Sequence, residues 1–140
     1  MVAGLTLFHS TALPDSEEKK KDRERIIGLV QRNQDVYVKA AIPSLYAPRH
    51  VETYRRQIEH TIAEAQKFPK QGIIANIRGM MERKDQTQLL RNAPVIKLVI
   101  HGTEDPVISN ERIEAQVTGT DIRYETLENI GHMGHVEAAK

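Results

Sequence analysis

The sequence predicts an α/β protein with a parallel sheet of about three strands, flanking helices and a four-helix insertion after the first strand. Short apolar runs alternate with longer amphipathic segments along the chain. Strands separated by helices form parallel sheets with right-handed crossovers. At 140 residues, the chain has room for one domain with a single modest core. No internal repeat or low-complexity segment interrupts this pattern.

The first predicted strand is the apolar run VAGLTLF, residues 2–8. A continuous apolar run of this length is typical of a parallel strand that is buried on both faces. We therefore expect this strand to be buried on both of its faces. If it has no neighbour on its other side, its unpaired edge invites pairing with another chain.

Residues 13–85 carry four amphipathic segments, which we interpret as a helical cap or lid. Asp15 or Ser16 can cap the first helix, and Pro43 interrupts the second. Apolar residues recur at helical spacing, for example in the fourth segment at Ile73, Ile74, Ile77, Met80 and Met81. Arg83 and Asp85 are expected to form a local ion pair. The insertion is too long for a plain crossover connection.

Residues 86–140 return to alternating strands and helices. The run VIKLVIHG, residues 95–102, predicts a second buried strand, and DIRYETL, residues 121–127, predicts a third. A short helix lies between them, and a last helix begins at Gly134. The predicted core therefore comprises residues 1–12 and 86–140, with residues 13–85 inserted as the cap.

Composition excludes several function classes. The net charge is +1, which gives no reason to expect nucleic acid as a partner. No apolar run approaches the ~20 residues of a membrane helix. The chain has no cysteine, which excludes disulfides and thiolate chemistry. We expect a cytoplasmic protein that needs no metal or other cofactor.

Two polar residues are predicted to meet at the carboxyl edge of the sheet. Asp105 follows the second strand, and His132 lies in the loop after the third. Functional groups in open α/β sheets gather at this edge. A carboxylate beside an imidazole fixes its tautomer and stabilises its protonated form. The pattern therefore predicts an acid–base pair.

The motifs around these residues resemble the α/β-hydrolase family. Gly-x-x-Asp-Pro-Val follows an apolar strand, and Gly-His-Met is followed by a nearby Val-Glu. The family triad runs in the chain order Ser, Asp, His, so the resemblance implies Asp105 as the acid and His132 as the base. GLTLFHSTA is similar to the strand that follows the nucleophile. The resemblance implies a truncated α/β-hydrolase fold and hydrolysis of esters or related acyl compounds.

The nucleophile that this resemblance implies is not found. No Gly-x-Ser-x-Gly occurs in the sequence, and none of the four serines lies between glycines on a predicted elbow: Ser10, Ser16, Ser44 and Ser109. His9 is not expected to activate Ser10, because neighbouring strand side chains point to opposite faces. The resemblance implies that Ser10 lines the pocket, and the methionines Met80, Met81 and Met133 are further candidates for substrate contact.

Three interpretations of function stay open. In the first, a missing or separate segment supplies the serine of an ester hydrolase. In the second, the chain is a catalytically inactive fragment or a binding module that keeps the cap. In the third, the reading frame extends upstream of the first residue and encodes the missing half. We expect association through residues 2–8, either as a homodimer or with a separate chain that carries the missing half.

The remaining histidines are given structural roles. His101 ends the second strand and should pack near Asp105, whereas His50 and His60 are expected to be exposed helix residues. His135 is expected at the surface, or behind His132, rather than as a metal ligand, because no suitable carboxylate is identified.

Overall fold

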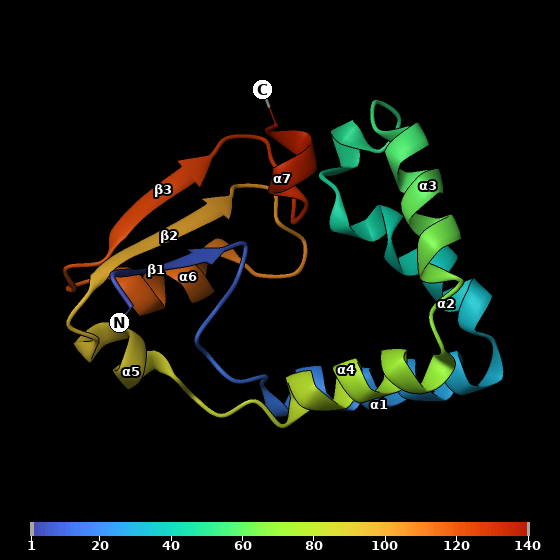
Figure 1. The fold of residues 1–140 in the computed structure, drawn as a ribbon, viewed down its shortest axis with the longest axis horizontal. Helices are drawn as coiled ribbons and strands as arrows, with labels where there is room; N and C mark the ends of the chain where they lie inside the picture. Colours follow the sequence, from blue (N-terminus) through green and yellow to red (C-terminus); the bar gives the residue numbers. More distant parts are fainter. Residues whose placement is uncertain (1, 140) are drawn as a thin grey trace. The chain divides into compact units, whose positions relative to one another are not determined.

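A three-stranded parallel sheet organises part of the chain, as predicted (Figure 1). The structure is a computed structural model and describes residues 2–139. The strands are β1 (Gly4–Phe8), β2 (Ile96–Gly102) and β3 (Arg123–Leu127), and β2 lies in the middle. Leu7 is in register with Val99, and Val99 with Tyr124. The carboxyl ends of the three strands therefore lie at one edge of the sheet.

The chain divides into two compact units. The sheet unit comprises the described residues up to Leu13, Leu45–His50, and the described residues from Asp85 onward, and the helical unit comprises Pro14–Ser44 and Val51–Lys84. The sequence predicts 13–85 as one insertion, whereas the sheet unit also takes in Leu13 and Asp85 at its two ends and the segment Leu45–His50 within it. This segment joins the sheet unit because the Leu45 carbonyl accepts a hydrogen bond from the His132 N–H, over 2.7 Å. Residues 1 and 140 of the predicted core lie outside the described residues.

The sheet unit has its own apolar core. Val99 on β2 and Ile113 on α6 (Asn110–Val117) are fully buried and pack with Leu90 of α5 (Thr87–Asn92). Gln116 is also fully buried, and its Oε1 accepts the Ala12 N–H at 2.6 Å. This side-chain bond ties the segment after β1 to α6. The core thereby fixes the positions of the strand ends.

The prediction that the first strand is buried on both faces is wrong for this chain. Val2, Leu5 and Phe8 are 69%, 38% and 41% exposed. The reason is topological: β1 is an edge strand that pairs only with β2 among the described residues. Leu7 of this strand packs against the core.

Four α-helices form the helical unit, in agreement with the predicted number: α1 (Glu17–Arg32), α2 (Gln34–Ala41), α3 (Arg55–Ala65) and α4 (Lys70–Met81). Two 3₁₀ turns, η1 (Pro43–Leu45) and η2 (Pro48–His50), lie between α2 and α3. Ser16 caps α1 by accepting the Lys19 N–H at 3.2 Å. Helices α1 and α4 lie side by side (Figure 1), joined by Ile27, Val30 and Ile77. None of the described helices combines the length and apolar character that crossing a membrane requires.

The expected ion pair between Arg83 and Asp85 is wrong. Arg83 lies 3.8 Å from the Asp15 carboxylate, which also binds Arg23. Asp85 instead accepts the Thr87 N–H at 2.7 Å. A carboxylate just before a helix stabilises the fold more by accepting from the free N–H groups of the first turn than by forming an exposed ion pair.

Candidate functional site

Asp105 is held rigidly in the turn after β2. Its side chain is fully buried, and its Oδ1 accepts the N–H groups of Val107 and Ile108 at 2.8 and 3.0 Å. An aspartate that bonds the backbone two residues on forms an Asx turn, which fixes the carboxylate without outside help. The other oxygen, Oδ2, therefore points to a defined place at the edge of the sheet.

His132 occupies that place. Its Nδ1 lies 2.8 Å from Asp105 Oδ2, and its side chain is 24% exposed. The structure thus brings together the two residues that the strand-end pattern predicted would meet. With Nδ1 bound to the carboxylate, Nε2 is the ring atom for proton exchange with a reacting group. The catalytic role of the pair stays a prediction.

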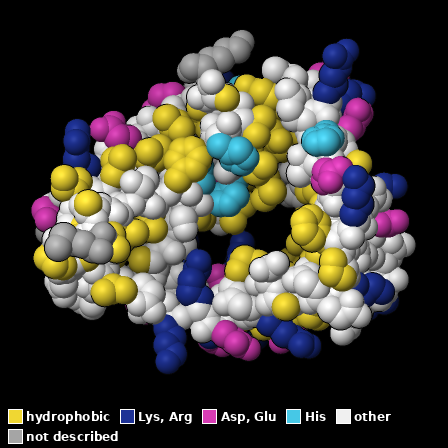
Figure 2. Space-filling view, viewed as in Figure 1, with side chains coloured by type: hydrophobic (Ala, Val, Ile, Leu, Met, Phe, Trp, Pro, Cys, Tyr) yellow, Lys and Arg dark blue, Asp and Glu magenta, His cyan; other side chains and the backbone are white. Residues whose placement is uncertain are grey.

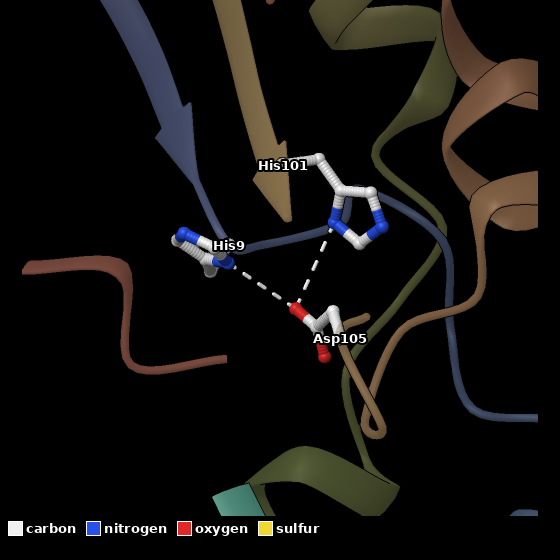
Figure 3. A group of neighbouring side chains, drawn as sticks. All are labelled: His9, His101 and Asp105. Atoms are coloured by element: carbon white, nitrogen blue, oxygen red, sulfur yellow. Dashed lines mark hydrogen bonds and ion pairs between the residues drawn. The ribbon is translucent and has the colours of Figure 1, made fainter. Parts of the chain in front are cut away.

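Two further histidines face the same carboxylate oxygen (Figure 3). His9 Nδ1 is 3.3 Å and His101 Nδ1 is 3.7 Å from Asp105 Oδ2, and both side chains are buried. The prediction that His101 packs near Asp105 is confirmed. Histidine side chains also gather on the face drawn in Figure 2, beside hydrophobic ones, where β1, β2 and α7 (Gly134–Glu137) meet in Figure 1.

The contact of His9 with Asp105 was not predicted from the sequence. The alternation argument assumed an extended strand, but β1 ends at Phe8, and His9 has a φ of +44°. This left-handed conformation is uncommon for residues other than glycine. It turns the imidazole toward Asp105, while the His9 N–H still donates to the Ile100 carbonyl at 2.9 Å. One feature of the sequence could have predicted this contact: His9 comes directly after an apolar strand, at the same edge of the sheet as Asp105.

The surroundings keep Asp105 ionised. Burial alone raises the pKa of this carboxyl, but hydrogen bonds from His132 and His9, and from the backbone N–H of Val107, outweigh it and hold the pKa well below its usual range. Burial lowers the pKa of His101 despite the nearby Asp105 carboxylate. The site therefore contains a fixed anion beside a neutral, buried imidazole.

A second buried carboxylate, Glu137, holds the loop that carries His132. Its Oε1 accepts the N–H groups of Gly131 and Met133 at 3.1 and 3.2 Å, and its Oε2 accepts the Ala47 N–H at 3.0 Å. His50 Nδ1 lies 2.8 Å from Oε2. The expectation that His50 is an exposed helix residue is therefore wrong, because this contact leaves its side chain 22% exposed in a 3₁₀ turn.

Glycines in and beside this loop allow the backbone to pack closely against neighbouring segments. A Cβ at Gly131 would collide with the Ala47 nitrogen, and one at Gly134 would collide with His9 Nε2. A Cβ at Gly102, at the end of β2, would collide with the Ile130 carbonyl. Side chains at these positions would separate the histidine loop from the strand ends, so glycine is required for the observed approach.

The other predicted site residues have varied surroundings. Ser10 is partly buried just after β1, and Met133 precedes α7. Met80 and Met81 pack on the core of the helical unit. Contact of any of these four residues with a substrate stays a prediction. His60 and His135 are exposed, as expected.

The fold was compared with known proteins. No protein-family model matches the sequence, and no curated protein matches it. Among solved structures, a thermophilic esterase from Thermogutta terrifontis superposes with a TM-score of 0.83 at 28% identity, over 97% of this chain and 51% of the other. An esterase from Exiguobacterium antarcticum gives a TM-score of 0.83 at 18% identity, over 99% and 53%. An enol-lactonase from Burkholderia xenovorans LB400 gives 0.80 at 18% identity, over 99% and 52%.

A parallel α/β sheet with an aspartate and a histidine at its carboxyl edge is the arrangement of α/β hydrolases. The chain has the α/β-hydrolase fold, and it spans about half the length of the solved chains that it matches. The expected resemblance and the expected fold class are therefore confirmed.

Proposed function

We propose that this chain supplies the acid–base pair of an ester hydrolase whose nucleophilic serine comes from a polypeptide segment outside these 140 residues. The observation that carries the proposal is the 2.8 Å contact between His132 Nδ1 and Asp105 Oδ2 at the carboxyl edge of the sheet. The likeness to the Thermogutta esterase supports an ester as the substrate class.

In this proposal, each residue has a defined task. His132 Nε2 takes the proton from the serine hydroxyl as the serine attacks the ester carbonyl, and later returns it to the leaving alcohol. Asp105 stays ionised, holds the imidazole in the tautomer that carries its proton on Nδ1, and stabilises the imidazolium that forms. The amide donors that stabilise the oxyanion come with the serine, since they belong to the nucleophile turn and a neighbouring loop.

The exposed edge of β1 is the proposed surface for that segment. Leu5 and Phe8 are 38% and 41% exposed on a strand that pairs on one side only among the described residues. Because an unpaired apolar edge favours strand addition, we propose that a strand of the serine-bearing polypeptide pairs with β1. A second copy of this chain, paired edge to edge, is the competing occupant. A cytoplasmic location also stays a prediction.

Light scattering tests the choice of occupant. If a second copy pairs with β1, the purified chain elutes as a dimer, and Leu5→Lys returns it to a monomer. A chain that is monomeric alone, and associates only with the polypeptide encoded upstream of Met1, supports the proposal. The matched control is Val36→Lys, at an exposed position on α2.

Turnover of a short activated ester tests the function. The chain alone should hydrolyse it at the background rate, and a fluorophosphonate probe should leave its serines unlabelled. Joined to a segment with a Gly-x-Ser-x-Gly turn, it should become active. His132→Ala should then lower the rate by several orders of magnitude, as in known triads, whereas His135→Ala should not. Turnover by the chain alone that depends on His132 would refute an external nucleophile.

A binding module without catalysis is the second candidate. The absence of a Gly-x-Ser-x-Gly turn in the sequence favours it, together with the exposed edge of β1. It predicts stable association through β1 with no hydrolysis in any combination. Equal background rates for the joined wild-type protein and its His132→Ala variant would support this candidate over the hydrolase.

A further inference from the structure

Three donor groups of the sheet unit converge on one point. One nitrogen each of His9 and His101 and one oxygen of Asp105 lie within 4.8 Å of one another, and all three residues are buried (Figure 3). His9 comes from the end of β1, His101 from β2, and Asp105 from the following turn. The donors therefore lie on, or within a few residues of, the carboxyl ends of two paired strands.

Hydrogen bonding does not account for the whole cluster. Asp105 Oδ2 already contacts His132 at 2.8 Å and His9 at 3.3 Å, so the 3.7 Å contact of His101 is too long for a hydrogen bond. Neither ring nitrogen of His101 has a hydrogen-bond partner of good geometry among the described residues, although the residue is 0% exposed and the side chain of Asn110 lies nearby. Leaving a buried polar group unsatisfied is costly. The unpartnered Nδ1 points toward Asp105 (Figure 3).

The separations are close to those of a coordination shell, with all three donor atoms within 4.8 Å of one another. Zinc binds imidazole nitrogen and carboxylate oxygen at about 2.0–2.2 Å, so two ligands in a tetrahedral shell lie about 3.3–3.6 Å apart. The distances from Asp105 Oδ2 to His9 and His101 Nδ1 are 3.3 and 3.7 Å. Small side-chain rotations would complete the set. Two imidazoles and one carboxylate suit first-row transition metals, whereas Mg²⁺ and Ca²⁺ require mostly oxygen ligands.

We propose that His9, His101 and Asp105 form a binding site for one divalent transition-metal ion such as Zn²⁺. The three residues leave at least one coordination position for water or a small ligand. His132, bonded to the same carboxylate, and the Asx turn at Val107 and Ile108 provide the outer contacts that orient the ligating oxygen. This proposal does not depend on the proposed hydrolase function, because binding is measured without turnover.

Calorimetric titration of the metal-free, untagged chain with Zn²⁺ tests the site. The wild type should bind one equivalent, and His9→Gln and His101→Gln should each abolish this saturable binding. His135→Gln is the matched control, because it removes an exposed histidine of the same sheet unit, and it should bind as the wild type does. Co²⁺ should give the intense visible bands of a four-coordinate site. Absence of a saturable equivalent, or binding unchanged in His9→Gln, would overturn the proposal.

If a buried-histidine variant fails to fold, imidazole nitrogen NMR of the wild type tests whether Zn²⁺ binds at His9 and His101. Addition of Zn²⁺ should move the ring nitrogen resonances of His9 and His101 and leave those of the exposed His60 unchanged. Shifts confined to the exposed histidines would refute the site, because they would place the ion on the surface.

Discussion

Replacing Glu137 with glutamine tests how the histidine loop is held. The substitution keeps the size of the side chain but exchanges one acceptor oxygen for an amide donor. Oε1 accepts two backbone N–H groups, whereas Oε2 accepts one backbone N–H and contacts His50. The amide nitrogen of the glutamine should therefore take the place of Oε2. There the unprotonated Nδ1 of His50 can accept a hydrogen bond from it, whereas the backbone N–H groups around Oε1 can only donate.

The expected loss of unfolding free energy comes from the one backbone N–H that the glutamine leaves without an acceptor. In that arrangement the Ala47 N–H, which is buried, faces another donor. An unsatisfied buried donor costs about 1–3 kcal/mol. With a urea m-value on the order of 2 kcal/mol/M, the unfolding midpoint should fall by roughly 0.5–1.5 M at unchanged m. Glu137→Ala strands three backbone donors and should cost about 3–9 kcal/mol by the same reasoning, enough to unfold many domains.

Urea denaturation followed by circular dichroism measures both variants. The matched control is Glu52→Gln, which removes an exposed partner of Arg55 and should leave the midpoint unchanged. If Glu137→Gln unfolds at the same midpoint as this control, the carboxylate is not what holds the loop. Other contacts would then hold Gly131–Met133 and His132 in place.

Three further predictions concern the same unit. Gly134→Ala should cost about 1–3 kcal/mol by overpacking and should shift the His9 imidazole resonances, because its Cβ would meet His9 Nε2; unchanged stability and resonances would contradict the packing. The lowered pKa of Asp105 means that its stabilisation is complete above the unfolded-state pKa of about 4 and is lost as the pH falls toward the folded-state value. The gap in unfolding free energy between the wild type and Asp105→Asn should therefore narrow below about pH 4, and a widening gap would refute this sign. Ile113→Ala should cost about 2–5 kcal/mol at a fully buried position, against a negligible change for exposed Leu89→Ala.

The sequence predicted those features that depend on local periodicity. The three strands, the four helices of the insertion and the parallel order follow from apolar spacing and from the alternation of strands with helices. The meeting of Asp105 with His132 follows from the same logic, since residues that come directly after parallel strands share one edge. These features needed no knowledge of side-chain packing.

Burial of the first strand could not be predicted in the same way. The apolar pattern of residues 2–8 indicates what the strand prefers to contact, but exposure depends on which neighbours are present. Leu5 and Phe8 are exposed because β1 lies at the edge of the sheet among the described residues. The mismatch between an apolar sequence and an exposed strand is itself the argument for a partner.

The roles of Glu137 and His50 depend on a contact between distant segments. The turn that contains His50 and Ala47 lies about ninety positions away from Glu137, as the separations of 87 and 90 show. Periodicity assigned that turn to the helical insertion, because nothing local distinguishes it. Only the folded chain reveals that its backbone and imidazole supply donors to a buried carboxylate.

His9 shows where strand-end reasoning stops. The edge of the sheet was predictable, but the direction of the imidazole depends on a φ of +44°, which alternation along an extended strand does not describe. That conformation costs free energy for a residue with a Cβ, so the surrounding contacts must hold it. The 3.3 Å contact with Asp105 is one such contact, and the close approach of Gly134 to the ring is another. A strained residue beside the candidate acid–base pair is where a second function of the site is best sought, and the proposed metal site uses this histidine.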